Sequence, residues 1–66
     1  MIQQAILGQR VVFVRETHGF IGPNHRIHLA IDPGITGTIV QIRRNGIVVR
    51  LDVGTPSGYP ANALIL

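Results

Sequence analysis

The chain has 66 residues, a length that allows one domain with a small hydrophobic core. It contains no cysteine, which excludes disulfides and cysteine-ligated zinc as sources of stability. Hydrophobic residues make up 45% of the chain and charged residues only 14%. A monomer of this size cannot bury so much apolar surface in its own core, so we expect a homo-oligomer.

The net charge of +3 comes from six arginines, since the chain has no lysine. Arginine suits bidentate contacts with phosphate, which makes nucleic acid a candidate partner, although a GC-rich genome also favours arginine. No apolar run approaches the roughly 18 residues that cross a bilayer, and the first residues lack a basic leader before an apolar segment. We therefore expect a cytoplasmic protein with no membrane partner.

Residues 9–15 are predicted to form the first strand, because β-branched and aromatic side chains are concentrated there. Alternation places Val11 and Phe13 on one face and Val12 and Val14 on the other. Since both faces are apolar, the outer valines indicate a sandwiched strand, contact with another subunit, or simple exposure.

Residues 16–24 are expected to form a long loop, because glycine, proline and asparagine interrupt any regular pattern. Residues 25–31 then alternate as in a half-buried strand, with Ile27, Leu29 and Ile31 on one face. The opposite face carries Arg26, His28 and Ala30.

The strongest structural signal lies in residues 36–52, where Asn45-Gly46 separates two runs rich in β-branched residues. This pattern predicts a β-hairpin, entered through a turn at residues 32–34. A register slip of one residue would exchange its two faces. One face is expected to supply the core with Val40, Ile42, Val49 and Leu51. The other face leaves Gln41, Arg43 and Arg50 in solvent.

Residues 53–60 have the composition of a loop, and residues 61–66 are predicted to contain a short turn and the last strand. The chain therefore predicts an all-β fold, a small five-stranded barrel with a long loop after the first strand. In this interpretation residues 1–7 form an N-terminal arm and residues 8–66 form the barrel domain.

Two segments resemble the SH3-like barrel superfold. Residues 34–39, Gly-Ile-Thr-Gly-Thr-Ile, resemble the glycine turn and strand entry of KOW-type modules. Residues 58–64, Gly-Tyr-Pro-Ala-Asn-Ala-Leu, are similar to the closing segment of Src-homology-3 domains. The second resemblance implies a one-turn 3-10 helix before the last strand. The first implies RNA, ribosome-associated or transcription-complex partners.

Departures from these families bear on function. The chain has no tryptophan, and Ala63 stands where Src-homology-3 domains usually carry an aromatic residue, so a polyproline groove is not expected. Tyr59-Pro60 and Ala63-Leu64 also resemble the last strand of type II dihydrofolate reductases. Ser57 and Gly58, however, align with the glutamine and isoleucine that contact cofactor and substrate in that family. A reductase is therefore the third and least favoured hypothesis.

No catalytic or cofactor-binding constellation is apparent. Without cysteine, and with three carboxylates in all, the chain offers neither a nucleophilic site nor a carboxylate pair. The histidines are His18, His25 and His28. His25 and His28 are three residues apart on a predicted strand, so they project to opposite faces and do not suit a shared metal ion. We therefore expect no catalytic residue, cofactor or metal.

The basic side chains are the candidate functional residues. Arginines at the hairpin tip and on the neighbouring strand are suited to phosphate contacts, and histidines can extend them. Two aromatic residues are available to stack on an unpaired base. The nucleic-acid hypothesis names Arg26, Arg43, Arg44, Arg50, His25, His28, Phe20 and Tyr59.

The alternative hypothesis is a protein-interaction or assembly subunit that docks through the outer valines Val12, Val14 and Val48. The two hypotheses differ in their response to salt, because added salt weakens phosphate contacts and leaves an apolar interface intact. In a third interpretation the arginine tip is solvated, keeps the domain soluble and protects its strand edges.

Overall fold

Strands run through most of the chain. The computed structural model describes residues 5–54 and 60–66, and the regular structure within these ranges is entirely β-strand. The strands are β1 (Arg10–Val12), β2 (Thr17–Ile21), β3 (Ile27–Ile31), β4 (Thr36–Arg43), β5 (Gly46–Gly54) and β6 (Pro60–Ile65). The predicted all-β class is confirmed. Among the described residues there is no helix, and so none that is long and apolar enough to cross a bilayer.

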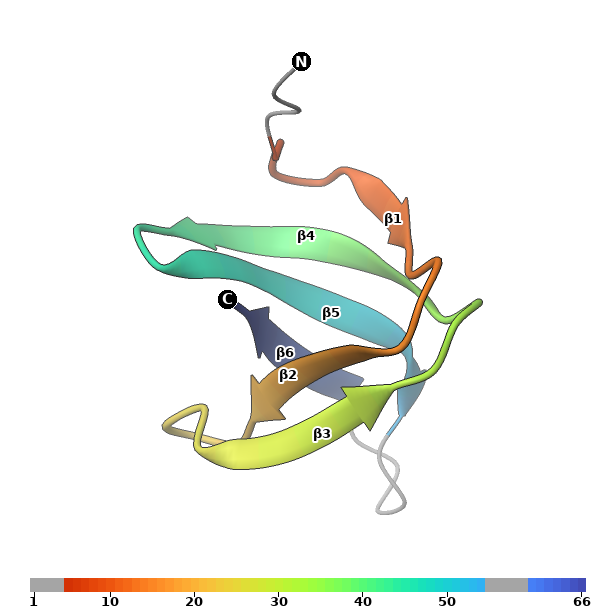
Figure 1. The fold of residues 1–66 in the computed structure, drawn as a ribbon. Helices are drawn as coiled ribbons and strands as arrows, with labels where there is room; N and C mark the ends of the chain where they lie inside the picture. Colours follow the sequence, from red (N-terminus) through yellow and green to blue (C-terminus); the bar gives the residue numbers. More distant parts are fainter. Residues whose placement is uncertain (1–4, 55–59) are drawn as a thin grey trace.

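All six strands form one antiparallel sheet in the order β1-β4-β5-β6-β2-β3. Strands β1 and β3 are its edges, so the sheet is open and does not close into the expected barrel. The sheet curls over one core, because Ile31 of the edge strand β3 packs in the same cluster as Ile39 of β4 and Val49 of β5. Figure 1 shows the β2–β3 hairpin and the β4–β5 hairpin as two arms of this curled sheet.

The core is small and aliphatic. Its members come from four strands and are each at most 5% exposed: Ile31, Ile39, Val49, Leu51, Ala61 and Ala63. Half-buried apolar residues extend it at both ends, including Val11 and Phe13, which share a face as the alternation predicts. Burial of this aliphatic face is the main force that holds the sheet in its curled shape.

Strand β2 is the largest departure from expectation, because a long loop was predicted over residues 16–24. Glycine at position 19 suggested a break, but here it allows close packing between strands. A Cβ atom at Gly19 would lie 2.8 Å from Cδ1 of Ile65 and 3.3 Å from the carbonyl oxygen of Leu64. The glycine therefore lets β2 approach β6, and the sheet gains a sixth strand in place of the expected five.

Two other boundaries differ from the prediction. The first strand, expected over residues 9–15, is limited to β1 at Arg10–Val12. The expected one-turn 3-10 helix is not found in the described part of the chain, since β6 is extended from Pro60 onward. Residues 55–59 lie outside the described residues.

The β4–β5 hairpin forms as predicted, with an irregularity that changes which side chains enter the core. Arg43 pairs with Gly46, so Arg44 and Asn45 form the turn. The register pairs Ile39 with Val49 and Gln41 with Val48, which leaves Val40 as the extra residue of a β-bulge.

The bulge corrects the predicted core on β4. Ile39 is buried at 2% exposure, whereas Val40 and Ile42, both expected in the core, are 45% and 49% exposed. Ile42 lies on the same face as the core residues of β5. It is nevertheless exposed, because it pairs with Ile47 next to the β4–β5 turn, at the end of the hairpin. Val49 and Leu51 are buried as predicted, and Gln41, Arg43 and Arg50 are exposed as predicted.

Candidate nucleic-acid interface

Two turns and the end of β6 surround a hollow at one end of the sheet. In Figure 1 the β2–β3 turn, the β4–β5 turn and the C-terminus lie together at the left. The hollow has a volume of about 410 Å³. We call it the basic hollow, and its lining residues are Phe20, Asn24, His25, Arg26, Arg43, Asn45, Leu64 and Leu66.

One wall of the basic hollow is the β2–β3 turn. Ile21 pairs with Ile27, and the residues between them form a turn closed by a hydrogen bond from the His25 amide to the Gly22 carbonyl oxygen at 3.2 Å. Gly22 has a φ of 95° and His25 a φ of 51°. The left-handed conformation suits glycine but is strained for histidine. The turn therefore holds a half-buried imidazole in the lining at some conformational cost.

The opposite wall is the tip of the β4–β5 hairpin. Alternation along β4 places Arg43 on the same face as Gln41, away from the core. The Nε atom of Arg43 donates a hydrogen bond to Oε1 of Gln41 at 3.1 Å. This contact fixes the base of the guanidinium group, while its two terminal nitrogens form the fork that binds phosphate bidentately.

Phe20 and Leu64 form the apolar floor of the basic hollow and belong to a row across three strands. Phe20 of β2 pairs with Leu64 of β6, which pairs with Val48 of β5. Leu64 and Val48 are 6% and 3% exposed, and Phe20 is half-buried. The ring of Phe20 meets His28 edge to face, with centroids 5.9 Å apart and planes inclined by 68°. Phe20 is therefore held in place and keeps part of its ring accessible.

The acidic side chains of the described residues lie outside this lining. Among the described residues, Asp52 is bound to Arg10 in a salt bridge, Glu16 lies beside His18, and Asp32 lines a different cavity. Arg26 and Arg43 thus line the basic hollow, and none of its described lining residues is acidic. The arrangement favours an anionic ligand.

The pair of Arg10 and Asp52 is an unpredicted feature on the outer face of β1, β4 and β5. Arg10 donates to both carboxylate oxygens of Asp52 and, through Nη1, to the hydroxyl of Thr38 at 2.8 Å. Thr36 donates its hydroxyl to the same carboxylate. Hydrogen bonds from Arg10 and Thr36 hold the pKa of Asp52 well below its usual range, and the carboxylate raises the pKa of Arg10. The network ties the edge strand β1 to β5 across β4.

A second unpredicted cluster lies on the outer face of the β2–β3 hairpin. Nδ1 of His18 is 2.8 Å from Nε2 of His28, with ring centroids 4.8 Å apart and planes inclined by 20°. Oε1 of Glu16 is 3.4 Å from Nε2 of His18. The sequence predicts His25 and His28 on one strand, with their side chains on opposite faces. In the structure His25 lies in the turn, and the unrecognised strand β2 supplies His18 as the neighbour of His28.

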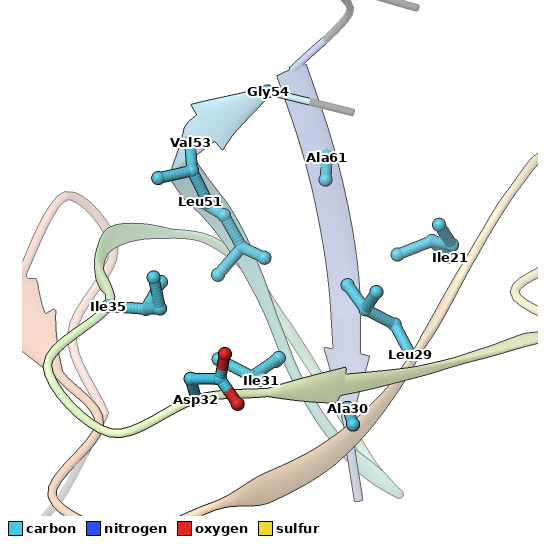
Figure 2. Close-up of a pocket in the computed structure, with 10 residues that line it drawn as sticks. All are labelled: Ile21, Leu29, Ala30, Ile31, Asp32, Ile35, Leu51, Val53, Gly54 and Ala61. Carbon is cyan, nitrogen blue, oxygen red and sulfur yellow. The ribbon is translucent and has the colours of Figure 1, made fainter. Parts of the chain in front are cut away.

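Figure 2 shows a second cavity, which opens from the core between the ends of β3, β5 and β6. Its volume is about 260 Å³, and core residues such as Ile31, Leu51 and Ala61 contribute to its wall. Asp32 is the one charged side chain among its lining residues. This cavity is an apolar extension of the core whose carboxylate disfavours an anion.

The structure gathers half of the residues proposed for nucleic-acid binding. Phe20, His25, Arg26 and Arg43 line the basic hollow, and His28 borders it through the ring of Phe20. Arg44 is exposed in the β4–β5 turn without lining the hollow. Arg50 is not part of it, because it lies between Thr38 and Asn62 in the sheet. The predicted Tyr59 lies outside the described residues.

Sequence reasoning missed four lining residues, namely Asn24, Asn45, Leu64 and Leu66. The two asparagines were recognised only as turn formers, although their amides also provide hydrogen-bond donors. Leu64 shares a face of β6 with Asn62, and Leu66 follows the strand; no local pattern indicates that this face meets Phe20.

The outer valines proposed as a protein interface divide into two groups. Val12 and Val14 are exposed at 56% and 79%, as the interface hypothesis requires. Val48 does not fit, because it is buried at 3% exposure beside its pairing partners Gln41 and Leu64. Val48 supports the floor of the basic hollow and is not available for docking.

Comparison with protein-family models, with curated proteins and with solved structures finds no match to this chain.

Proposed function

We propose that this protein is a small, non-enzymatic, all-β binding module that contacts single-stranded RNA or DNA through the basic hollow. The observation that carries the proposal is the meeting of two hairpins: Arg26 and His25 come from one turn, and Arg43 comes from the other. Two guanidinium groups and an imidazole, in a lining that includes no acidic side chain among the described residues, suit a phosphate group.

The aromatic floor supports an unpaired base as the second part of the ligand. Phe20 is half-buried on Leu64 and presents part of its ring to the hollow. Stacking of a base on an aromatic side chain contributes about 1–3 kcal/mol and tolerates any base. The side-chain amides of Asn24 and Asn45 supply donors and acceptors at the rim. The proposed ligand is therefore a nucleotide of an unpaired strand, bound with little sequence preference.

The proposed family relation is consistent with this ligand. The KOW-like turn at residues 34–39 and the Src-homology-3-like segment at residues 58–64 are the basis for proposing an SH3-like relationship and a ribosomal or transcription-complex partner. The open antiparallel sheet is compatible with a small β-barrel-like fold. A polyproline ligand and a reductase activity are not proposed.

The test is fluorescence anisotropy with a labelled mixed-sequence oligonucleotide, in RNA and DNA forms, at low and high salt. With two or three phosphate contacts, the slope of log K against log salt should be about −1.4 to −2. Arg43→Gln and Arg26→Gln should each reduce the slope by about 0.7 and weaken binding roughly tenfold. Phe20→Leu should weaken binding with little change in slope.

Arg15→Gln is the matched control, because it removes the same charge from a residue before β2 that does not line the basic hollow. It should have a smaller effect than Arg43→Gln. Equal losses for the two variants would show that binding depends on net charge alone. No binding at low salt would contradict the proposal altogether.

Self-association through β1 is the second candidate function. Val12 lies in the edge strand β1 and Val14 lies two residues beyond its end, and they are 56% and 79% exposed, so a second copy or a protein partner can cover them. Light scattering at low and high salt tests this hypothesis. A salt-resistant oligomer that Val14→Glu dissociates would support it, and a monomer in both conditions would contradict the self-association.

A further inference from the structure

The outer face of the β2–β3 hairpin holds a cluster that the proposed nucleic-acid contacts do not require. Phe20 of β2 pairs with His28 of β3. His18 lies two residues before Phe20, so its side chain is on the same face of the hairpin as those of Phe20 and His28. Such diagonal positions on neighbouring strands are within reach of long and aromatic side chains. The two imidazoles meet with Nδ1 of His18 2.8 Å from Nε2 of His28.

We propose that His18 and His28 form a binding site for a divalent transition-metal cation of the copper, nickel and zinc class. Imidazole nitrogens bind these ions at about 2.0–2.1 Å, and two ligands at a right angle are then about 2.9 Å apart. The nitrogen separation in the structure, 2.8 Å, is close to this value. Both rings are exposed, so rotation of each ring can direct both lone pairs toward one ion.

Glu16 prepares His18 for this role. Its carboxylate lies 3.4 Å from Nε2 of His18, the nitrogen that faces away from His28. A carboxylate at this position favours the proton on Nε2 and leaves a lone pair on Nδ1, as in the carboxylate–histidine–metal arrangements of known sites. In the metal-free state His28 donates its Nε2 proton to that lone pair. When an ion replaces this hydrogen bond, the proton moves to Nδ1 of His28 by exchange with water.

Two protein ligands limit the affinity and define the selectivity. Within the part of the chain that the structure describes, no group of three or more His, Cys, Asp or Glu side chains is arranged so that all of them could hold one metal ion. Water therefore completes the coordination shell, and binding is strongest for copper, which leads the order of affinities for nitrogen ligands. Magnesium prefers oxygen ligands and should not compete.

The experiment is calorimetric titration of the full chain with Cu²⁺, Ni²⁺, Zn²⁺ and Mg²⁺ in a non-chelating buffer at neutral pH. The first three ions should bind, with Cu²⁺ the tightest, and Mg²⁺ should not. The electron paramagnetic resonance spectrum of the Cu²⁺ complex should show coupling to two imidazole nitrogens. Acidification should release the ion, because protonation removes the lone pairs that bind it.

Four variants separate this site from other histidine chemistry. His18→Ala and His28→Ala should each weaken Cu²⁺ binding by more than tenfold, and Glu16→Gln should weaken it by about tenfold or less. His25→Ala should leave Cu²⁺ affinity unchanged, because His25 lies in the basic hollow and outside the pair. Equal losses for His25→Ala and His28→Ala, or wild-type affinity in the His18→Ala variant, would overturn the proposal.

Discussion

The two hairpins that form the walls of the basic hollow differ in how they are held. The β4–β5 hairpin is paired from Gly37↔Leu51 to Arg43↔Gly46 and continues through β5 into β6. The β2–β3 hairpin is paired along its own length, but β2 pairs with β6 at one position, Phe20↔Leu64. One wall is therefore built into the centre of the sheet, and the other is attached at its margin.

This difference assigns distinct roles to the two sides of the site. Regions with few attachments open locally at lower free energy than regions in the centre of a sheet. Arg43 therefore lies on the more firmly attached hairpin, whereas Arg26 and His25 lie on the hairpin expected to open at lower free energy. The contrast can be tested by perturbing each hairpin in turn.

Gly46→Ala should give the largest effect, because Gly46 begins β5 against the last strand. A Cβ atom there would lie 2.1 Å from the carbonyl oxygen of Ile65, and backbone would have to move. We expect a loss of about 3 kcal/mol or more in the free energy of unfolding, measured by urea denaturation. This loss is a large part of the stability of a small domain.

Gly22→Ala is the matched substitution in the β2–β3 turn. Gly22 has a φ of 95°, and its nearest neighbour would be Cδ1 of Ile27 at 3.1 Å, the end of a flexible side chain. The expected cost is about 1–2 kcal/mol, mainly from the backbone conformation. Equal costs for the two substitutions would contradict the difference between the hairpins.

Leu64→Ala removes the side chain that joins β2 to the centre of the sheet. Leu64 is 6% exposed and pairs with both Phe20 and Val48. We expect a loss of about 2–3 kcal/mol. Hydrogen exchange should accelerate more at the amides of β2 and β3 than at those of β4 and β5. Uniform acceleration would show that the two hairpins open together.

The β4–β5 hairpin was predictable and the β2–β3 hairpin was not, for a local reason. Asn45-Gly46 marks a turn within a few residues, and the β-branched runs beside it need no distant partner to be recognised. Gly19 and Gly22 have two different roles, a close approach to β6 and a left-handed turn, and both depend on contacts that local sequence does not encode.

The same limit applied to the candidate site. Composition made arginine the candidate functional residue type, and Arg26 and Arg43 do line one hollow. Which residues line that hollow depends on which strand ends lie together. Because β2 was not predicted, the positions of His18 and Phe20 could not be derived. The bulge at Val40 is a further example. Because Val40 is an extra, unpaired residue in β4, Ile39 lies in the core and Val40 is exposed, the reverse of what alternation predicted.

Strong acid should weaken the attachment of the edge strand β1 to β4 and β5. The pKa of Asp52 is held below its usual range by Arg10 and Thr36, so the network stabilises the fold above the unfolded-state pKa of about 4. That stabilisation is lost as the pH falls through the lower folded-state pKa. Hydrogen exchange at β1 should therefore increase in strong acid, and Asp52→Asn should abolish this pH dependence. A pH dependence that persists in the variant would exclude Asp52 as its cause.

His25→Gly should give the smallest change in stability and should separate stability from binding. His25 has a φ of 51°, a conformation that glycine adopts without strain, so the variant should be more stable by up to about 1 kcal/mol. The same substitution removes an imidazole from the basic hollow and should weaken oligonucleotide binding. His25→Asn is the control, because asparagine tolerates the left-handed conformation and keeps a hydrogen-bonding side chain. If His25→Gly is less stable than the wild type, the turn stores no strain. The imidazole would then support the packing of the β2–β3 hairpin.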